Sequence, residues 1–549
     1  MPTNGPAGNR QGWLDRPVAL ADWFLTAGER GNPASRLDDR HPDGAAWSRG
    51  NLVRPLVHGS AYFAELKRAV QRAVRGDLLL FVDWRGDPDE RLTGEPGSEV
   101  SRVLCLAASR GVDVRGLVWR SHLDRLQFSE VENRHLDEDV NAAGGQCLLD
   151  MRVRVGGSHH QKFVVLRHPG RPELDVAFVG GIDLCHSRRD DATHAGDPQR
   201  QPMAAVYGPR PPWHDVQVAI HGPAVGDVET VFRERWDDPQ PLSRNPVHLL
   251  ADALRRDDRA ARRLPPQLPD PAAAGPHAVQ LLRTYPRRLG RYPFAPDGER
   301  SVAHGYGKVL RRARRLVYLE DQYLWCEEVA ATFAGALRDQ PDLHLIAVLP
   351  HYSDLDGRLA LPPNVLGRVQ ALALLRAAGG ERVHVYGPEN HAGTPVYVHA
   401  KVCVVDDVWA SVGSDNVNRR SWTHDSELSV AVLDDTLDER PPREIAGERP
   451  RAYARDLRLR LAREHLDRAD GDDADLLDPR SAVEAFAAAA GALQDWHDRG
   501  RRGPRPPGRL RPLVEQRLPP ATVLWGDPLY RTVYDPDGRP RKLRRQRRF

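Results

Sequence analysis

Residues 398–428 read VHAKVCVVDDVWASVGSDNVNRRSWTHDSEL, and residues 159–191 read HHQKFVVLRHPGRPELDVAFVGGIDLCHSRRDD. Each stretch holds a His-x-Lys triplet, a run of mostly β-branched residues, a polar interruption and a second apolar run that ends in glycine. The lysine precedes Gly180 by 18 positions in the first stretch and Gly413 by 12 in the second, so the first copy has a longer loop around residues 167–172. The two stretches therefore indicate an internal duplication rather than a short-period repeat array.

The two triplets each place an imidazole beside an ammonium group. Side chains two positions apart on a strand share a face, so His160 is expected beside Lys162 and His399 beside Lys401. A single such pair also fits the solvated edge of a strand. Two pairs at equivalent positions of a duplication favour a site for an anion.

The use of lysine supports this interpretation. The chain has 79 lysines and arginines, but lysine stands only at positions 67, 162, 308, 401 and 542. Arginine is therefore used almost wherever a positive charge is needed. A compact ammonium and a planar guanidinium are not interchangeable, so the two triplet lysines indicate chemistry that needs the ammonium.

The sequence around the two stretches alternates between strand and helix patterns. Strands are expected at 77–83 and 112–119 and helices at 61–75 and 99–110. After the segment LPPQLPDPAAAGP the same order returns, with strands expected at 279–283, 316–320 and 343–350 and helices at 301–315 and 328–338. This alternation predicts a layered α/β fold.

The composition shifts along the chain predict five segments. They are an irregular N-terminal extension at 1–50, a first domain at 51–263, a Pro/Ala linker at 264–276, a second domain at 277–466 and a C-terminal extension at 467–549. The last segment contains an Ala-rich helix at 481–496 and ends in RPRKLRRQRRF, which holds seven basic residues.

The two stretches resemble the paired H-x-K-x-x-x-x-D motifs of the phospholipase D superfamily. The second copy matches in full from His399 to Asp406, and the downstream segments GSDNVNRRS and DSEL are similar to the residues that come after the motif in that family. The first copy matches at its histidine, its lysine and the later GGIDL, but Arg167 stands in place of the aspartate. Weaker similarity extends over most of residues 50–440 and includes WHDVQVAIHGPAV, FRERW, QLLRTYP and EDQYL.

The resemblance implies two tandem phospholipase D-like α-β-α sandwich domains, related by a pseudo-two-fold axis, that bring both triplets into one cleft. It also implies phosphodiester cleavage without a metal or a cofactor, through a phosphohistidine. His160 would be the nucleophile and His399 the general acid, while the two triplet lysines would stabilise negative charge on the phosphate oxygens. By position in the motifs, Asp183 would orient His160 and Glu427 would orient His399.

Several other residues receive expectations from their positions. Ser414, Asn416 and Asn418 are expected to donate hydrogen bonds to phosphate, although such residues also form ordinary turns. Asp406 lies seven residues after His399, an odd offset that points it away from the triplet face, so its role is expected to be structural. Arg167 has the same offset, and its change to alanine is predicted to cost about 1 kcal/mol or less, as for a surface residue. Core or surface positions, rather than the cleft, are expected for His58, His122, His351 and Trp84.

Composition excludes several other classes of protein. A net charge of +3 argues against binding nucleic acid through bulk electrostatics. The five cysteines form no C-x-x-C pair and are expected to be reduced thiols. The acidic groups at 87–90 and 470–475 lack the spacing of an EF-hand, so no metal is assigned. No H-E-x-x-H, P-loop or G-x-S-x-G motif is present to indicate a competing chemistry. No apolar run long enough to span a bilayer and no signal peptide is recognised.

Three substrate classes are compatible with the resemblance. The first is a phospholipase D that hydrolyses glycerophospholipids or transfers the phosphatidyl group to another alcohol, and EDQYL, DSEL and the WHDVQVAIHGP segment favour it. The others are a nucleic-acid phosphodiesterase and a phosphatidyl transferase similar to cardiolipin synthases. We expect a monomeric cytoplasmic protein that acts on phospholipid at a membrane surface, with peripheral contact through the basic tail and no nucleic-acid partner.

Overall fold

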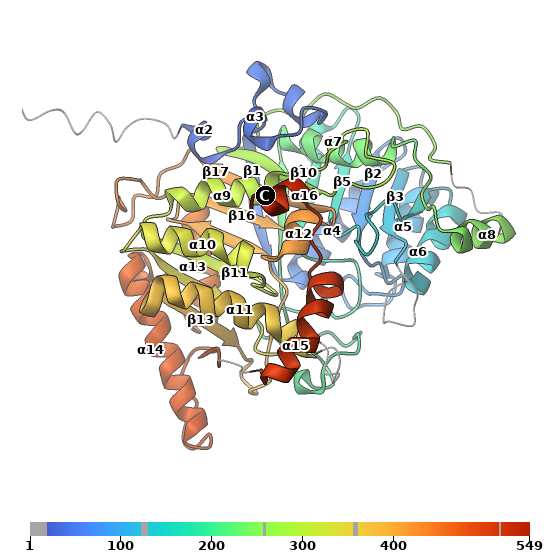
Figure 1. Ribbon diagram of the computed structural model, residues 1–549. Helices are drawn as coiled ribbons and strands as arrows, with labels where there is room; N and C mark the ends of the chain where they lie inside the picture. Colours follow the sequence, from blue (N-terminus) through green and yellow to red (C-terminus); the bar gives the residue numbers. More distant parts are fainter. Residues whose placement is uncertain (1–18, 122–129, 256–259, 355–360, 515–517) are drawn as a thin grey trace, which may run out of the picture.

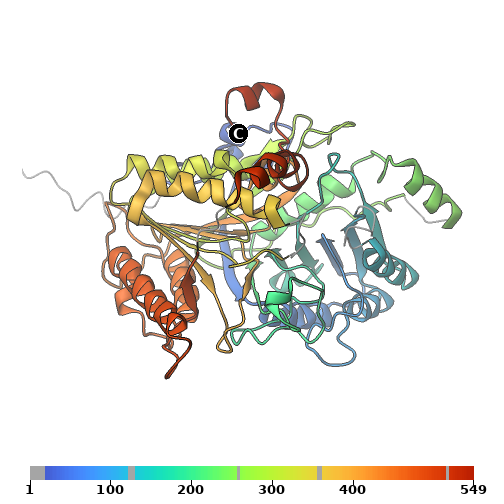
Figure 2. The same cartoon turned by 60° about the horizontal axis from the view of Figure 1, so that its bottom comes forward.

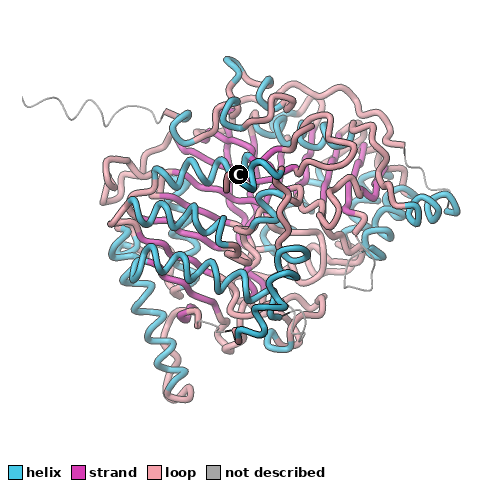
Figure 3. The backbone as a smooth tube through the Cα atoms, viewed as in Figure 1, coloured by secondary structure: helices cyan, strands magenta, loops and turns pink. Residues whose placement is uncertain are grey.

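The computed structural model describes residues 19–121, 130–255, 260–354, 361–514 and 518–549. Within these residues, sixteen strands form one sheet. Figure 3 shows strands running through both halves of the molecule. A second, two-stranded parallel sheet pairs β7 (Trp213–His214) with β14 (Tyr397–Val398). The fold is α/β, as predicted.

The strand order repeats in the two halves. Read from the outer edge to the centre, the first half has the order β4-β3-β2-β5-β6-β8-β1 and the second half has the order β13-β12-β11-β15-β16-β17-β9. The strands β1 and β9 pair antiparallel at the centre. Equivalent strands occupy equivalent places on either side of this pair, so the predicted pseudo-two-fold relationship is confirmed.

The bounds of these strands match the apolar runs in the sequence. Those of the first half are β1 (Ser48–Val57), β2 (Leu78–Asp83), β3 (Asp113–Trp119), β4 (Gln146–Asp150), β5 (Phe163–Arg167), β6 (Val176–Gly180) and β8 (Val216–His221). Those of the second half are β9 (His277–Tyr285), β11 (Leu316–Glu320), β12 (His344–Val348), β13 (Val383–Pro388), β15 (Val402–Val405), β16 (Trp409–Gly413) and β17 (Glu427–Asp434). The short strands β10 (Glu299–Arg300) and β18 (Leu510–Pro512) pair with β9 and β13.

Helices cover both faces of the sheet, which gives the layered arrangement seen in Figures 1 and 2. One face carries α4 (Gly59–Arg72), α5 (Val100–Ser109), α6 (Glu130–Ala142), α9 (Ser301–Arg312), α10 (Glu327–Asp339) and α11 (Leu361–Gly379). The other face carries α7 (Ala224–Trp236), α13 (Ala452–His465) and α14 (Pro479–Asp498). The core between the sheet and these last helices is continuous across the two halves.

Residue patterning explains these layers. All six residues of β2, LLLFVD, are buried, as expected for a strand covered on both faces. In α4 the buried residues Phe63, Leu66 and Val70 recur at helical spacing and form one stripe that packs on the sheet. The predicted helices at 61–75, 99–110, 301–315, 328–338 and 481–496 are all present, with ends shifted by a few residues.

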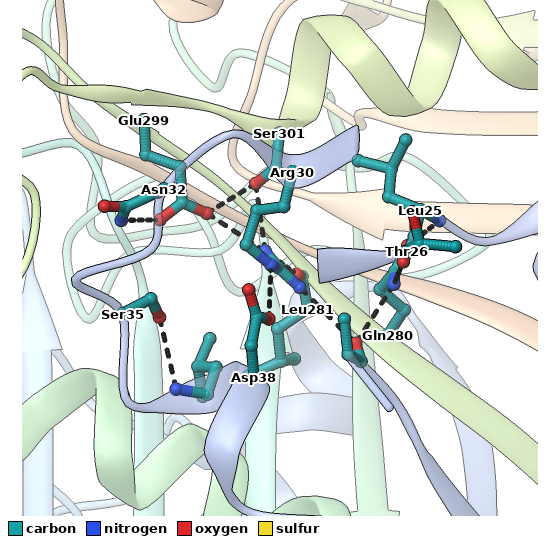
Figure 4. Close-up of polar contacts among 12 residues, drawn as sticks. Leu25, Thr26, Arg30, Asn32, Ser35, Asp38, Gln280, Leu281, Glu299 and Ser301 are labelled. Atoms are coloured by element: carbon teal, nitrogen blue, oxygen red, sulfur yellow. Dashed lines mark hydrogen bonds and ion pairs between the residues drawn. The ribbon is translucent and has the colours of Figure 1, made fainter. Parts of the chain in front are cut away.

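The N-terminal extension is docked on the second half. It contains the short helices α2 (Leu20–Trp23) and α3 (Ala27–Arg30), and β1 begins at Ser48. The buried Arg30 side chain pairs with Asp38 inside the extension and joins the extension to the sheet through an ion pair with Glu299, as Figure 4 shows. The predicted domain limits themselves stay a prediction.

The C-terminal segment also folds back on the second half, through α15 (Pro520–Leu529) and α16 (Arg541–Arg545). Arg539 is buried, 2.8 Å from Asp537, and the ring of Phe549 packs on Trp422. One of the seven basic residues of the tail is therefore an internal ion-pair partner. The other six, at 541, 542, 544, 545, 547 and 548, lie at least partly in solvent.

Arg167 is not the surface residue that the sequence predicted. Its guanidinium is buried, pairs with Asp175 at 2.9 Å and with Glu229 of α7, and donates a hydrogen bond to the carbonyl oxygen of Pro269. The position lies at the opposite end of β5 from Lys162, so the parity argument that takes it out of the cleft holds. The burial of Arg167 could not be predicted from the sequence, because α7 and the linker, which cover this residue, are distant from it along the chain.

Asp406 has the structural role that its odd offset predicts. Its carboxylate accepts hydrogen bonds from the backbone N–H groups of Arg314, Arg315 and Leu316. These bonds fix the start of β11 next to β15. Among the described residues, no helix is both long and apolar enough to cross a membrane.

Candidate active site

A cavity of about 470 Å³ opens between the two halves and contains both triplet histidines. His160 comes from the segment just before β5, and His399 comes from the segment between β14 and β15. The other lining residues are Trp84, Arg85, Glu132, Asp183, Arg188, Gln201, Pro202, Met203, Trp213, Gln322, Tyr323, Asp354 and Tyr397. The predicted meeting of the two triplets in one cleft is confirmed.

Each triplet has the same local geometry. Both segments directly precede their strands rather than lie in the ladder, which differs from the prediction by one or two residues. The ammonium of Lys162 donates to the carbonyl oxygen of His160 at 2.9 Å, and that of Lys401 donates to the carbonyl oxygen of His399. The lysine is thus held beside its histidine by the backbone of the triplet itself.

Each of the two histidines is oriented by a carboxyl group from the other half of the chain. Nδ1 of His160 lies 2.9 Å from Glu427 Oε2, and Nδ1 of His399 lies 2.6 Å from Asp215 Oδ2. The prediction that Asp183 orients His160 and that Glu427 orients His399 is therefore wrong. Within the part of the chain that the structure describes, the Nε2 atoms of both rings have no hydrogen-bond partner.

Burial and the lysines keep both imidazoles neutral. Burial, together with the charges of Lys162 and Lys401, holds the pKa of His160 well below its usual value. Burial, together with Lys401 and Arg188, does the same to the pKa of His399. A neutral imidazole whose Nδ1–H is donated to a carboxyl oxygen presents a lone pair on Nε2, as a nucleophile requires.

Asp183 belongs to the cationic side of the cavity instead. Its carboxylate lies 3.5 Å from the ammonium of Lys162 and 3.6 Å from Arg188. Burial alone would raise the pKa of Asp183, but these two cations outweigh it and the pKa is lowered. Burial and the negative charge of Asp183 together raise the pKa of neighbouring Asp83 well above its usual range, so Asp83 keeps its proton.

The three predicted phosphate ligands have different positions. Ser414 donates its hydroxyl hydrogen to Glu427 at 2.5 Å, and Asn418 caps α12 (Arg419–Thr423) by accepting from the backbone N–H of Ser421. The hydroxyl hydrogen of Ser414 is thus engaged by Glu427, whereas the side-chain NH2 group of Asn418 has no partner among the described residues, so donation to phosphate stays a prediction for Asn418. Asn416 lines an adjoining cavity of about 210 Å³ that also contains His160, so the expectation stands for this residue.

Sequence reasoning missed several residues of the site. Asp215 stands in the segment WHDVQVAIHGPAV, whose similarity to the family was visible but which gave no role for the aspartate. Trp213, 5.0 Å from the ring of His399, and Trp84, 6.1 Å from that of His160, flank the two histidines as an apolar pair. The expectation that Trp84 lies outside the cleft is therefore wrong. His58 and His351 are buried away from this cavity, as expected, and His122 lies outside the described residues.

This arrangement suits a phosphodiester. Two neutral imidazoles line one cavity, and the ammonium groups of Lys162 and Lys401 lie beside the lining residues Asp183 and Gln322. Arg188 adds a third fixed cation, 3.9 Å from the ring of Trp213. Such a site can bind an anionic phosphate, supply a nitrogen nucleophile and supply a second nitrogen for proton transfer.

Comparisons with known proteins agree with the geometry. A family model described as "Phospholipase D" matches residues 100–347, and one described as "Cardiolipin synthase, PLD-like domain" matches residues 367–444. Phospholipase D alpha 1 of Cynara cardunculus is 25% identical over 505 residues, covering 70% of this chain and 60% of its own length. Phospholipase D alpha 2 of Oryza sativa subsp. japonica is 27% identical over 458 residues, covering 62% of this chain and 55% of its own. The chain thus spans less than two thirds of the length of these relatives.

A solved structure is also similar. The crystal structure of phosphatidylserine synthase from Haemophilus influenzae aligns with 70% of this chain and 82% of its own, at 11% identity and a TM-score of 0.47. The two matched family segments together cover more than half of the chain, and each contains one of the His-x-Lys triplets. The chain belongs to the phospholipase D superfamily.

Proposed function

We propose that the protein is a phospholipase D-type phosphodiesterase that acts on glycerophospholipids through a phosphohistidine. The observation that carries the proposal is the pair of triplet histidines in one cavity, each hydrogen-bonded at Nδ1 to a carboxyl group of the other half. One ring cannot attack phosphorus and protonate the leaving group in the same step. Two rings oriented in this way can divide these tasks.

In the proposed first step Nε2 of His160 attacks phosphorus, and the bond to the head-group oxygen breaks. His399 donates a proton from Nε2 to that oxygen, and the phosphatidyl group stays on His160. Lys162 and Lys401 stabilise the charge on the non-bridging oxygens. The charges of Lys401 and Arg188 lower the pKa of His399, and the negative charge of a bound phosphate raises it again. Substrate binding therefore favours the protonated, acidic form of that ring.

In the second step His399 accepts a proton from water, which attacks phosphorus and releases phosphatidic acid and free His160. An alcohol that takes the place of water gives a new phosphatidyl ester. The similarity to plant phospholipases D supports a phospholipid as the substrate, and the apolar flanks Trp84 and Trp213 suit its acyl side.

A single assay tests the reaction and the substrate class together. The purified chain is incubated with mixed phospholipid vesicles and ethanol, and the lipids are analysed by mass spectrometry. We expect phosphatidylethanol and phosphatidic acid, both absent with His160→Ala. Cleavage of single-stranded DNA without change to any phospholipid would overturn the lipid assignment.

A second candidate is phosphatidyl transfer for lipid synthesis. The match of residues 367–444 to the cardiolipin synthase-type family model favours it. Supplying phosphatidylglycerol as the sole lipid separates the two, because a synthase-like transferase forms cardiolipin and glycerol, whereas a hydrolase forms phosphatidic acid.

We further propose that the six remaining basic residues of the tail, at 541, 542, 544, 545, 547 and 548, contact an anionic membrane surface. Each contributes on the order of 1 kcal/mol near such a surface, reduced by salt. Changing the six to glutamine, with Arg539 left in its internal ion pairs, should weaken binding to phosphatidylserine vesicles and leave cleavage of a monomeric short-chain phospholipid unchanged. Unaltered vesicle binding would contradict this role.

A further inference from the structure

A second cluster of titratable groups lies behind the cavity and is not used by the proposed chemistry. It consists of His58, His194, His214 and Glu464 and is called here the histidine cluster. His58 follows β1, His194 lies in the loop before β7, His214 ends β7, and Glu464 comes from α13 in the other half of the chain. The three histidines are buried, and the side chain of Glu464 is 12% exposed.

The ligand atoms of the cluster converge on one point. One nitrogen from each ring and a carboxylate oxygen all lie within 4.8 Å of one another. The carboxylate of Glu464 is 2.8 Å from His58 Nε2, 3.1 Å from His194 Nε2 and 3.3 Å from His214 Nδ1. Ligand atoms about 2.0–2.1 Å from a tetrahedral zinc ion stand about 3.3 Å apart, so only small movements separate this arrangement from a coordination shell.

Outer hydrogen bonds fix which nitrogen carries the proton in two of the three rings, while Nδ1 of His58 has no hydrogen-bond partner among the described residues. Nδ1 of His194 faces the carbonyl oxygen of Trp213 at 3.1 Å, and a carbonyl can only accept, so this nitrogen carries the hydrogen. Nε2 of His214 faces a carboxylate oxygen of Glu320 at 2.6 Å and is likewise the donor. When these two rings are neutral, Nε2 of His194 and Nδ1 of His214 direct lone pairs at Glu464, whose carboxylate oxygens also offer lone pairs.

Lone pairs that face one another repel. Either a bound cation or extra protons on the rings can remove this repulsion. The pattern of outer partners favours the cation. Histidines that bind metals donate their other N–H to a carboxylate or a backbone carbonyl, as His214 and His194 do here. Glu320 is itself held by Tyr318 at 2.5 Å and His465 at 2.7 Å, so the partner of His214 is fixed in turn.

We propose that the histidine cluster binds one divalent transition-metal ion of the zinc class, through His58 Nε2, His194 Nε2, His214 Nδ1 and a carboxylate oxygen of Glu464. Three imidazoles and one carboxylate form a ligand set that suits zinc. The site joins three segments of the first half to α13, and its role is structural.

The site also adjoins the catalytic segment. The backbone carbonyl of His214 accepts a hydrogen bond from the N–H of His399 at 2.8 Å, and the next residue is Asp215, which orients the ring of His399. A metal on His214 therefore holds the short β7–β14 sheet that positions this histidine. Motif reasoning missed the cluster because its four members are scattered from residue 58 to residue 464 and form no motif.

The test measures metal binding on the full chain purified without a polyhistidine tag. Elemental analysis of the wild type should find about one zinc per chain. After removal by a chelator, titration with Co²⁺ should give the visible absorption of a tetrahedral site and saturate at one ion. His58→Gln and His194→Gln should weaken Co²⁺ binding by roughly 10- to 100-fold or more. His391→Gln, at an exposed histidine paired with Asp467, is the matched control and should bind as the wild type does.

Three results would overturn the proposal: no stoichiometric zinc or Co²⁺ in the wild type, equal metal content in the two cluster variants, or equal loss in the control. A second measurement decides the matter if the variants do not fold. The melting temperature of the wild type should fall on chelation and recover with Zn²⁺. If the melting temperature changes with neither treatment, the cluster binds no metal and its histidines and Glu464 are held together by shared protons.

Discussion

Nδ1 of His160 lies 2.9 Å from Oε2 of Glu427, a carboxylate 267 residues away in the other half of the chain. In the reciprocal pair, His399 of the second half is oriented by Asp215 of the first half, 184 residues earlier in the chain. Each half therefore supplies a triplet and the carboxylate that orients the triplet of its partner half. Neither half is expected to form an oriented histidine alone.

The crossed pairing makes Asp215 a positioning residue for the general acid. Asp215→Asn offers an amide that can donate to Nδ1 of His399 and so stabilise the wrong tautomer. We expect kcat to fall by about 10²-fold or more, with KM changed little, because the contact is to the ring and not to substrate. Asp342→Asn, at an exposed aspartate paired with Arg315, is the control. Asp215→Asn with more than a tenth of wild-type kcat would contradict the assignment.

Lysine should not be replaceable by arginine in the triplets. The ammonium groups of Lys162 and Lys401 bond to backbone carbonyls within their own triplets, and a planar guanidinium does not fit that point contact. Lys162→Arg and Lys401→Arg should fold normally, as judged by circular dichroism, and be strongly impaired. Lys67→Arg, at a lysine outside the cavity, should keep full activity. Normal turnover in both triplet variants would mean that charge alone suffices there.

The sequence predicted the fold and the catalytic pairs well, because both rest on repeated local patterns. The order of strands and helices follows from apolar periodicity, and the triplets are marked by scarce lysine. The orienting carboxylates were mispaired because a duplication suggests that each motif is complete in itself, whereas the two-fold assembly exchanges Glu427 and Asp215 between halves. The hydrogen bond from Ser414 to Glu427 could not be predicted from the sequence, because only the adjoining strands create that contact.

The burial of Arg167 reverses the expected energetic role of that residue. Arg167→Ala removes the buried cation between Asp175 and Glu229. These carboxylates then keep only His168 and Arg233 as partners among the described residues, so we expect a loss of about 3 kcal/mol in the free energy of unfolding. Turnover per folded molecule should change little, because the residue lies away from the cavity. Urea unfolding measures the first quantity. Arg287→Ala, at an exposed arginine, should stay within about 0.5 kcal/mol of wild type. Equal stabilities of the two variants would contradict the buried network.

The free energy of unfolding should fall as the pH rises, because burial opposes the ionisation of Glu427. Burial, with the nearby charge of Asp425, raises its pKa from 4.5 to about 8. Between these two values the folded state holds a proton that the unfolded state has lost, so the free energy of unfolding falls as pH rises through this window. Glu427→Gln removes that effect and should be more stable than wild type by on the order of 1–3 kcal/mol near pH 8, with a smaller gain near pH 5.

The same substitution should reduce turnover, because the carboxylate orients His160. Glu484→Gln, at an exposed glutamate, is the control for both measurements and should show neither effect. A Glu427→Gln protein that is less stable than wild type at every pH would indicate a permanent ion pair between Glu427 and His160 instead.

The central claim is that His160 attacks phosphorus while His399 supplies the proton, and trapping the intermediate tests it most directly. A substrate with a p-nitrophenol leaving group needs no acid to depart, so His399→Ala should still form the covalent species but fail to hydrolyse it. Peptide mass spectrometry after rapid quenching at alkaline pH, where phosphohistidine survives, should locate the added group on the peptide that contains His160. His160→Ala should give no adduct. An adduct on His399, or turnover of a natural phospholipid by His160→Ala above about a tenth of the wild-type rate, would contradict the account.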